Sequence, residues 1–187
     1  MDSTAFAPPA PSRRRLIQWA GAALATSLMP LPGNAHALPQ PVRSLSFDHT
    51  HTGEKLTVDY ATGGGYDPQA LQSLSQFLRD FRTGEAHPIE PRLFDQLYVL
   101  SRITGARKPF QVISAYRSPA TNSDLRKHSS GVASHSLHLD GRAIDIRLPD
   151  VRLADLRDAA LALKAGGVGY YPGSNFVHID TGAVRRW

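Results

Sequence analysis

The sequence contains no cysteine, so it can form neither a disulfide framework nor a thiolate metal site. Any metal ion must therefore be bound by histidine, aspartate or glutamate. The sequence also lacks a basic run with interleaved aromatic residues, which is the pattern typical of nucleic-acid binding. Its apolar runs are all shorter than the roughly 20 residues that span a bilayer. No internal repeat is visible.

The first 37 residues have the layout of an export signal. A twin-arginine signature occupies residues 12–17, an apolar run covers residues 19–31, and Ala35-His36-Ala37 is a small-x-small cleavage site. We predict that residues 1–37 are a twin-arginine signal peptide, removed after Ala37 in the periplasm. The alternative is a retained membrane anchor, but the apolar run is too short for one, so no stable membrane insertion is expected after cleavage.

The chain that remains, roughly 150 residues, matches one domain with one core. The whole chain has a formal net charge of +5, and the part that remains after cleavage stays mildly basic. A basic surface suits an anionic cell-wall polymer. Nucleic acid is not an expected partner of an exported protein. The sequence gives no indication of the oligomeric state.

Residues 38–64 are predicted to form a proline-rich leader followed by a hairpin, because residues 44–59 alternate at period two around a turn at Thr52-Gly53-Glu54. His49 and His51 lie on this hairpin. Metal binding is one interpretation of the pair, but exposed histidines on an edge strand are the preferred one. The remaining residues, 65–187, are predicted to form the main domain.

Helices and strands mix along this main domain. Helical spacing predicts a helix from Pro68 capped by Asp67, a second over residues 91–104, a short helix or turn over 121–128, and a helix opened by Pro149-Asp150. Strands are predicted over residues 110–114, 143–147, 168–171 and 175–180. The expected fold class is α+β, with a small mixed or antiparallel sheet and helices packed on one face.

Three residues are candidate metal ligands. His138 and Asp145 lie in the stretch 134–145, where Gly141 allows close packing, and His178 lies far away in the last predicted strand. Each histidine alone is more often a satisfied or solvent-facing side chain. Asp145 and His178, however, place polar groups inside apolar strands, where an unpaired carboxylate is costly. Two nitrogens and one oxygen would make a zinc site with an open fourth position.

Arg117 follows the predicted strand 110–114. A guanidinium group fixed at the end of a buried strand can bind a carboxylate through two parallel charge-assisted hydrogen bonds. The alternatives are a surface arginine, or one that pairs with Asp145 or another structural acid.

The pattern Ser136-x-His138-x-x-Gly141-x-Ala143-x-Asp145 also resembles a known family. Together with Ser114-x-Tyr116-Arg117-Ser118 and the late His178, it is similar to the LAS group of zinc peptidases, which includes D-alanyl-D-alanine carboxypeptidases, murein endopeptidases and the hedgehog signalling domain. The Gly-Val-Gly-Tyr-Tyr and His-x-Asp-Thr-Gly elements at residues 167–171 and 178–182 favour the murein endopeptidase K-like branch. The resemblance covers roughly residues 65–187.

This resemblance implies Zn²⁺ held by His138, Asp145 and His178, and a fold like that of hedgehog and D-Ala-D-Ala peptidases. It further implies that the substrates are peptide stems of peptidoglycan, with Arg117 and Ser136 as substrate-binding candidates. The implied function is a zinc-dependent murein endopeptidase that hydrolyses peptide cross-links.

One position departs from the family pattern. Many members place an acid three residues before the last histidine as general base, and this chain has Asn175 there. The catalytic candidates are then Asp180, two residues after His178 and on the same side of its strand, and His135. Asp180 could instead support a ligand histidine or bind the turn at Thr181-Gly182.

Two other functions remain open at this stage. Asn175 would permit a non-catalytic domain of the same fold that only binds peptidoglycan. Arg117 would suit a D,D- or L,D-carboxypeptidase, in which it would hold the free carboxylate of the terminal residue.

Overall fold

The computed structural model describes residues 41–128 and 133–187. These described residues belong to one compact unit. The predicted signal peptide, residues 1–37, lies outside the described residues. Within the described ranges, no helix has the length and apolar character needed to cross a membrane.

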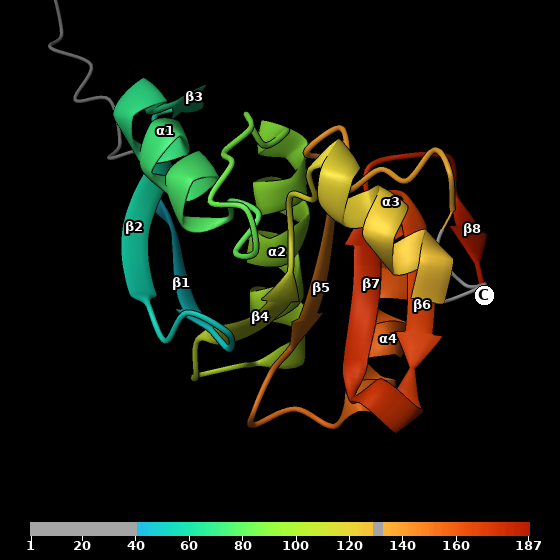
Figure 1. Cartoon of the computed structure of the whole chain (residues 1–187). Coiled ribbons are helices and arrows are strands. Elements are labelled where there is room, and N and C mark those ends of the chain that lie inside the picture. The colour runs from blue at the N-terminus through green and yellow to red at the C-terminus, as the bar shows by residue number, and fades with distance from the viewer. Residues whose placement is uncertain (1–40, 129–132) are drawn as a thin grey trace, which may run out of the picture. The chain divides into compact units, whose positions relative to one another are not determined.

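One sheet runs through the described residues, with eight strands in the order β3-β2-β1-β4-β5-β7-β6-β8 (Figure 1). Most neighbouring strands are antiparallel, whereas β1 with β4 and β6 with β8 are parallel. The prediction of an α+β fold with a mixed sheet is therefore confirmed. The strands are β1 (Arg43–His49), β2 (Lys55–Thr62), β3 (Gly65–Tyr66), β4 (Phe110–Ser114), β5 (Ala143–Arg147), β6 (Gly167–Tyr171), β7 (Phe176–Asp180) and β8 (Arg185–Arg186).

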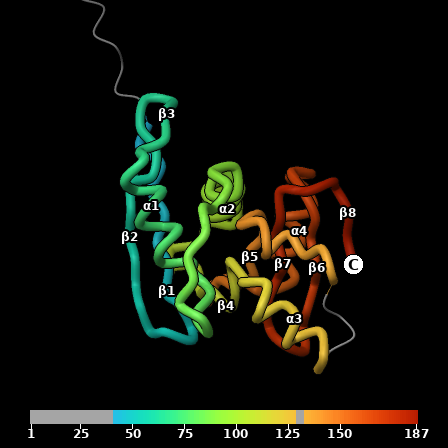
Figure 2. Tube along the Cα trace, turned by 45° about the horizontal axis from the view of Figure 1, so that its top comes forward, coloured from blue at the N-terminus to red at the C-terminus, as the bar shows by residue number. Residues whose placement is uncertain are grey.

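The helices of the described residues are α1 (Pro68–Phe77), α2 (Pro91–Thr104), α3 (Pro119–His128) and α4 (Leu153–Leu163), with a short 3₁₀ helix η1 (Pro172–Ser174). α2 and α4 contact each other on one face of the sheet. α3 lies on the other side, in front of β6 and β7, in both Figure 1 and Figure 2. The two faces of the sheet are therefore covered differently.

Helix boundaries follow local sequence signals. α1, α2 and α3 each begin at a proline, whose fixed φ suits the first turn and whose missing N–H would have no partner there. The carboxylate of Asp67 accepts hydrogen bonds from the backbone N–H groups of Gln69 and Ala70, as predicted for the cap of α1. α4 starts later than predicted, at Leu153, because Asp150 instead binds the backbone of the segment before β4.

The predicted hairpin is present, but its first strand, β1, is not the edge strand that was expected. β1 pairs with β2 on one side and in parallel with β4 on the other, so it is an internal strand. His49 is therefore only 2% exposed, and the prediction of an exposed edge-strand histidine is wrong for this residue. Its Nδ1 accepts hydrogen bonds from the backbone N–H groups of His51 and Thr52.

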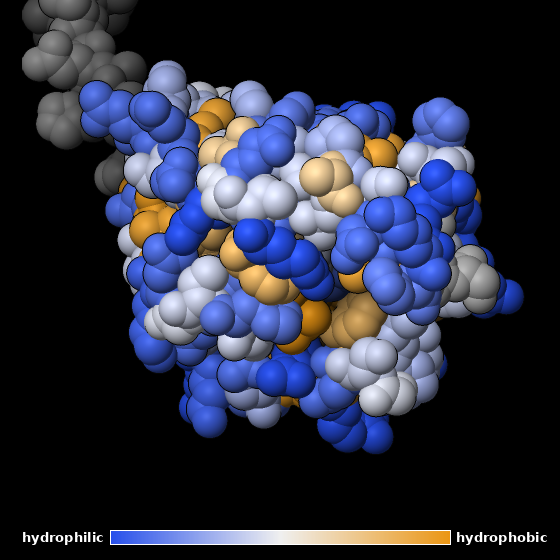
Figure 3. All heavy atoms as spheres, viewed as in Figure 1, coloured by the Kyte–Doolittle hydropathy of each residue, from blue (hydrophilic) through white to orange (hydrophobic). Residues whose placement is uncertain are grey.

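The core lies between the sheet and the helices. On the face of the molecule in Figure 3, apolar residues appear only as small patches between hydrophilic ones. Burial of the core side chains removes them from water, which is the main stabilising contribution to the fold. The largest fully buried side chains are Tyr60, Phe47, Phe94, Leu74, Leu78, Leu93, Leu97, Leu100, Ile144, Ile146, Leu156 and Ile179.

A buried carboxylate connects the segment after α1 to the start of α3. Asp80 is 1% exposed and accepts hydrogen bonds from the backbone N–H and the hydroxyl of Ser118, at 2.9 and 2.7 Å. Burial alone would raise the pKa of Asp80, but the hydrogen bonds from Thr121 and Ser118 together lower it below the ordinary value of 3.8. The ionised form of Asp80 therefore stabilises this junction.

Replacement of Asp80 by asparagine tests this junction. Because the pKa of Asp80 is lowered in the folded state, its contribution is present above the unfolded pKa, near 4, and is lost as the pH falls below that value. Asp80→Asn should lower the free energy of unfolding by about 1–3 kcal/mol at pH 7. Denaturant unfolding from pH 7 to pH 3 should show the difference from the parent protein shrinking. Asp59→Asn, at an exposed position of β2, is the matched control. A difference independent of pH would contradict this assignment.

Candidate metal centre and active site

Three side chains converge at the middle of the sheet. Asp145 on β5 and His178 on β7 stand opposite each other in the antiparallel register, and His138 lies in the turn before β5. Asp145 Oδ1 is 2.9 Å from His178 Nδ1 and 3.4 Å from His138 Nε2, and the two nitrogens are 3.2 Å apart. One oxygen and two nitrogens, all within 4.8 Å of one another, thus face a common position.

Hydrogen bonds on the outer side of each imidazole fix which nitrogen faces this position. His138 Nδ1 lies 2.6 Å from the carbonyl oxygen of Ala115, which can only accept, so Nδ1 carries the proton and Nε2 presents a lone pair. His178 Nε2 lies 3.1 Å from Asp180 Oδ2, so it donates to the carboxylate and leaves Nδ1 for the site. Metal-binding histidines are oriented in this way.

The charges of the site favour a cation. Burial would raise the pKa of Asp145, but His138 and His178 beside it lower that pKa well below its usual range. Burial would likewise lower the pKa of His178, yet the carboxylates of Asp145 and Asp180 on its two nitrogens raise it. A buried carboxylate with two imidazole nitrogens is therefore suited to a proton or a metal ion between them, and the donor set fits a divalent metal.

The turn that carries His138 is held against the segment before α2. Gly141 has φ +64°, and a Cβ there would lie 2.2 Å from the carbonyl oxygen of Pro88, so only glycine fits. The backbone N–H of Glu90 donates to the carbonyl of Gly141 at 2.9 Å. The side chain of Arg142 in turn donates to Glu90 at 3.0 Å. These contacts keep His138 in register with β5 and β7.

Asp180 is buried behind the site. It is 0% exposed and receives hydrogen bonds from the backbone N–H groups of Gly167 and Gly182, from the guanidinium group of Arg185, and from His178. Burial would raise its pKa, but these donors lower it well below its usual range. The carboxylate of Asp180 therefore faces His178 from the side opposite the ligand position.

Arg117 follows β4 and lies at the same cavity as the three candidate ligands. Its backbone N–H donates to the carbonyl of His138, and its guanidinium group lies 3.4 Å from the side-chain oxygen of Asn122. Among the described residues, its Nε is the one buried side-chain nitrogen or oxygen without a hydrogen-bond partner. Burial lowers the pKa of Arg117, while the nearby Asp145 raises it.

A cavity of about 570 Å³ opens above the three candidate ligands. It brings together most residues that the sequence singled out, namely His135, Ser136 and Arg117 with His138, Asp145 and His178. Two residues are not among those that line it: Asp180, which is buried, and Asn175, which is exposed after η1 with φ 55°. The hydroxyl of Ser136 accepts from the backbone N–H of His138 at 3.4 Å.

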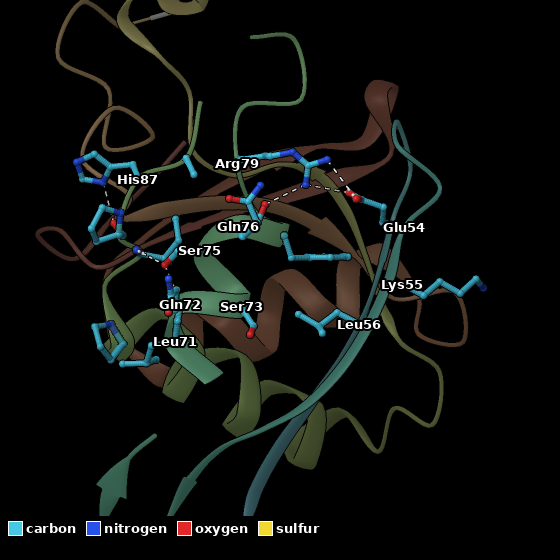
Figure 4. Close-up of a pocket in the computed structure, with 15 residues that line it drawn as sticks. Glu54, Lys55, Leu56, Leu71, Gln72, Ser73, Ser75, Gln76, Arg79 and His87 are labelled. Atoms are coloured by element: carbon cyan, nitrogen blue, oxygen red, sulfur yellow. Dashed lines mark hydrogen bonds and ion pairs between the residues drawn. The ribbon is translucent and has the colours of Figure 1, made fainter. Parts of the chain in front are cut away.

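A larger cavity, of about 1000 Å³, lies between β2, α1 and residues 86–91 (Figure 4). Two of its charged side chains, Arg79 and Glu54, are paired with each other. It contains no group of converging metal ligands among the described residues. Chemistry is therefore assigned to the smaller cavity.

Sequence reasoning did not find three residues that line or support the smaller cavity: Tyr171, Arg185 and Trp187. The available signal was the pair of glycines in β6. A Cβ at Gly167 would lie 2.5 Å from Arg185 Nη1, and one at Gly169 would lie 2.8 Å from the Trp187 ring. Glycine at alternate positions of a strand indicates close approach of another segment.

Comparison with known proteins is consistent with this site. Residues 38–187 match the family model described as peptidoglycan L,D-endopeptidase MepK. The chain is 46% identical to the peptidoglycan L,D-endopeptidase MepK of Escherichia coli strain K12, over 94% of this chain and 97% of that protein. It is 39% identical to the probable peptidoglycan L,D-endopeptidase MepK of Haemophilus influenzae, over 94% of this chain and 95% of that protein.

Two substitutions test the ligand set and its support. His138→Ala should abolish metal binding, because it removes one of three ligands. Asp180→Asn should weaken metal affinity about 10–100-fold, because Asn cannot hold His178 in the same way. Metal content and competition with a chelator of known affinity measure both effects. Asp158→Asn, at an exposed carboxylate paired with Arg157, is the control. Unchanged metal content in His138→Ala would remove the proposed ligand set.

Proposed function

The chain belongs to the peptidoglycan L,D-endopeptidase MepK family, and we propose on that premise that it is a zinc-dependent hydrolase of the cell envelope. It hydrolyses peptide cross-links of peptidoglycan, at a bond between an L-configured and a D-configured residue. The observation that carries this proposal is the convergence of His138 Nε2, Asp145 Oδ1 and His178 Nδ1 at the cavity.

The donor set favours zinc. Two imidazole nitrogens with one carboxylate oxygen are typical of catalytic zinc sites, whereas calcium and magnesium prefer sets of oxygen ligands. Three protein ligands leave a position open, as in catalytic rather than structural zinc sites. Zinc bound by these residues supplies Lewis-acid polarisation of a carbonyl group and an acidified water molecule.

His135 is the proposed proton-transfer residue. It is exposed, lies at the cavity with the metal ligands, and an imidazole can both accept and donate a proton near neutral pH. The other candidate, Asp180, is less suited because its carboxylate already receives donors from the backbone, Arg185 and His178. We assign Asp180 the positioning of His178 instead.

Arg117 and Ser136 are the proposed substrate-binding residues. The guanidinium group of Arg117 has donors left over after its contact with Asn122, and it faces the cavity from the end of β4. It can therefore bind a carboxylate or a carbonyl oxygen of a peptide stem. The hydroxyl oxygen of Ser136 accepts a hydrogen bond from the backbone of His138, so its hydrogen is available to donate. This hydroxyl can therefore donate to a second oxygen of the substrate.

The proposed route to the envelope is twin-arginine export. The signature at residues 12–17 and the cleavage site at residues 35–37 support it, and the periplasm is the compartment where peptidoglycan is exposed to such a hydrolase.

Incubation of the purified protein with isolated sacculi tests the function. We expect release of monomeric peptide stems from cross-linked dimers, and loss of that release when a chelator removes the metal. Dimers with an L,D-linked bond should be cleaved, whereas D,D-linked dimers of the same composition should not. Release of free terminal D-amino acids alone would indicate a carboxypeptidase. Binding without any product would indicate a non-catalytic module, which Asn175 would permit.

The role of His135 has a separate test. His135→Ala should lower kcat about 10²–10⁴-fold, which is the usual contribution of a general acid–base, while metal content stays that of the parent protein. His51→Ala removes an exposed imidazole outside the cavity and serves as the control. If His135→Ala retains full kcat, the proton is transferred by another group.

A further inference from the structure

Three aromatic side chains form one wall of the cavity that contains the metal ligands: Tyr171, Phe176 and Trp187. The rings of Tyr171 and Phe176 stack, with centroids 4.6 Å apart and an interplanar angle of 21°. The indole Nε1 of Trp187 donates to the hydroxyl of Tyr171 at 2.6 Å. The three rings therefore form a continuous surface, here called the aromatic wall.

Trp187 is exposed but fixed in place. Half of its surface, 50%, is accessible to solvent. Both of its backbone groups are hydrogen-bonded to β6. Its N–H donates to the carbonyl of Val168, and its carbonyl accepts from the N–H of Tyr170. Its ring lies so close to Gly169 that a Cβ there would be 2.8 Å away. An apolar surface that is both exposed and already ordered loses little conformational entropy when a ligand covers it.

The aromatic wall is in direct contact with the metal centre. The rings of Trp187 and His178 have centroids 5.2 Å apart. The guanidinium carbon of Arg185 lies 4.9 Å from the centre of the Trp187 ring, while the same group bonds to Asp180 behind His178. A substrate held on Trp187 would thus lie next to His178, one of the candidate metal ligands.

Most of the other side chains that line this cavity are polar, with Ala133 and Leu137 as the exceptions. Arg117, His135 and Ser136 carry hydrogen-bonding groups and lie on the segments before β5, whereas the aromatic wall comes from β6, β7 and the residue after β8. The cavity therefore combines a polar, cationic part with an apolar part. A peptide that carries a hydrocarbon portion matches both parts.

We propose that Trp187, with Tyr171 and Phe176, binds the methylene chain of a diamino-acid residue beside the scissile bond, and so sets the selectivity of the enzyme for cross-linked stems. Cross-links between peptide stems run through the side-chain amine of such a residue, so a hydrocarbon chain accompanies the bond. This assignment rests on the proposed function. It makes Trp187 a substrate-binding residue, while the chemical step depends on the metal ligands.

Steady-state kinetics on a soluble cross-linked peptide dimer tests the proposal. Trp187→Ala should raise KM roughly ten-fold, as expected for loss of a buried aromatic contact, and leave kcat within about three-fold. Trp187→Phe should restore most of the lost affinity, because it returns an apolar ring. Ile103→Ala, which truncates an apolar side chain of similar exposure on α2, is the control and should change neither constant. Metal content should match the parent protein in every variant.

Fluorescence gives an independent readout. The chain has two tryptophans, Trp19 and Trp187, so Trp19→Phe in the full chain leaves Trp187 as the sole tryptophan, which can be excited selectively over the tyrosines. Titration of this chelator-treated variant with the peptide dimer should give a saturable change in emission without turnover.

The outcomes separate this inference from the proposed function. If the parent protein cleaves the dimer but Trp187→Ala has an unchanged KM, the aromatic wall is not a binding site. Parallel losses of kcat and metal content would assign Trp187 a structural role and overturn the proposal. If the parent protein cleaves no dimer at all, the proposed function fails, while a saturable emission change would still support binding at Trp187.

Discussion

The carboxylate of Asp145 determines how the rest of the molecule is arranged. It lies in the middle of β5, almost without solvent, where an ionised group is unstable unless positive charge or hydrogen-bond donors surround it. Two imidazoles approach it, one from the neighbouring strand and one from the preceding turn. The sheet therefore forms a site suited to a cation, and the proposed metal-dependent chemistry depends on this site.

Support for the two imidazoles comes from distant parts of the chain. The carbonyl of Ala115, after β4, orients His138, and Asp180 orients His178. Asp180 is itself held by Arg185, a residue of the short edge strand β8. Each imidazole is thus held by a second layer of contacts. The positions of the candidate ligands therefore depend on packing and backbone register as well as on the ligand residues themselves.

The sequence predicted what depends on local signals and missed what depends on distant contacts. Prolines and the cap at Asp67 indicated where α1 and α2 begin, and apolar runs or alternation indicated the strands. The predicted starts of α3 and α4 differ by a few residues from those observed, Pro119 and Leu153. The parallel pairing of β1 with β4 joins segments separated by two helices, so nothing near His49 indicated that it would be buried. The candidate ligands could be proposed from the motif, but the direction in which Asp180 points depends on Gly167 and Arg185, which only the folded chain brings together.

The two glycines of β6 connect the support of His178 with the shape of the cavity surface. Since Gly167 and Gly169 leave space for Arg185 and Trp187, the same short segment supports a candidate metal ligand, His178, and forms part of the cavity surface. A change that displaces the whole segment, such as a larger residue at Gly167 or Gly169, would then alter both the support of His178 and the cavity surface. The effects of substitutions at residues 185 and 187 are therefore expected to depend on each other. Adaptation to a different wall polymer would proceed more readily through substitutions on the opposite, mostly polar side of the cavity.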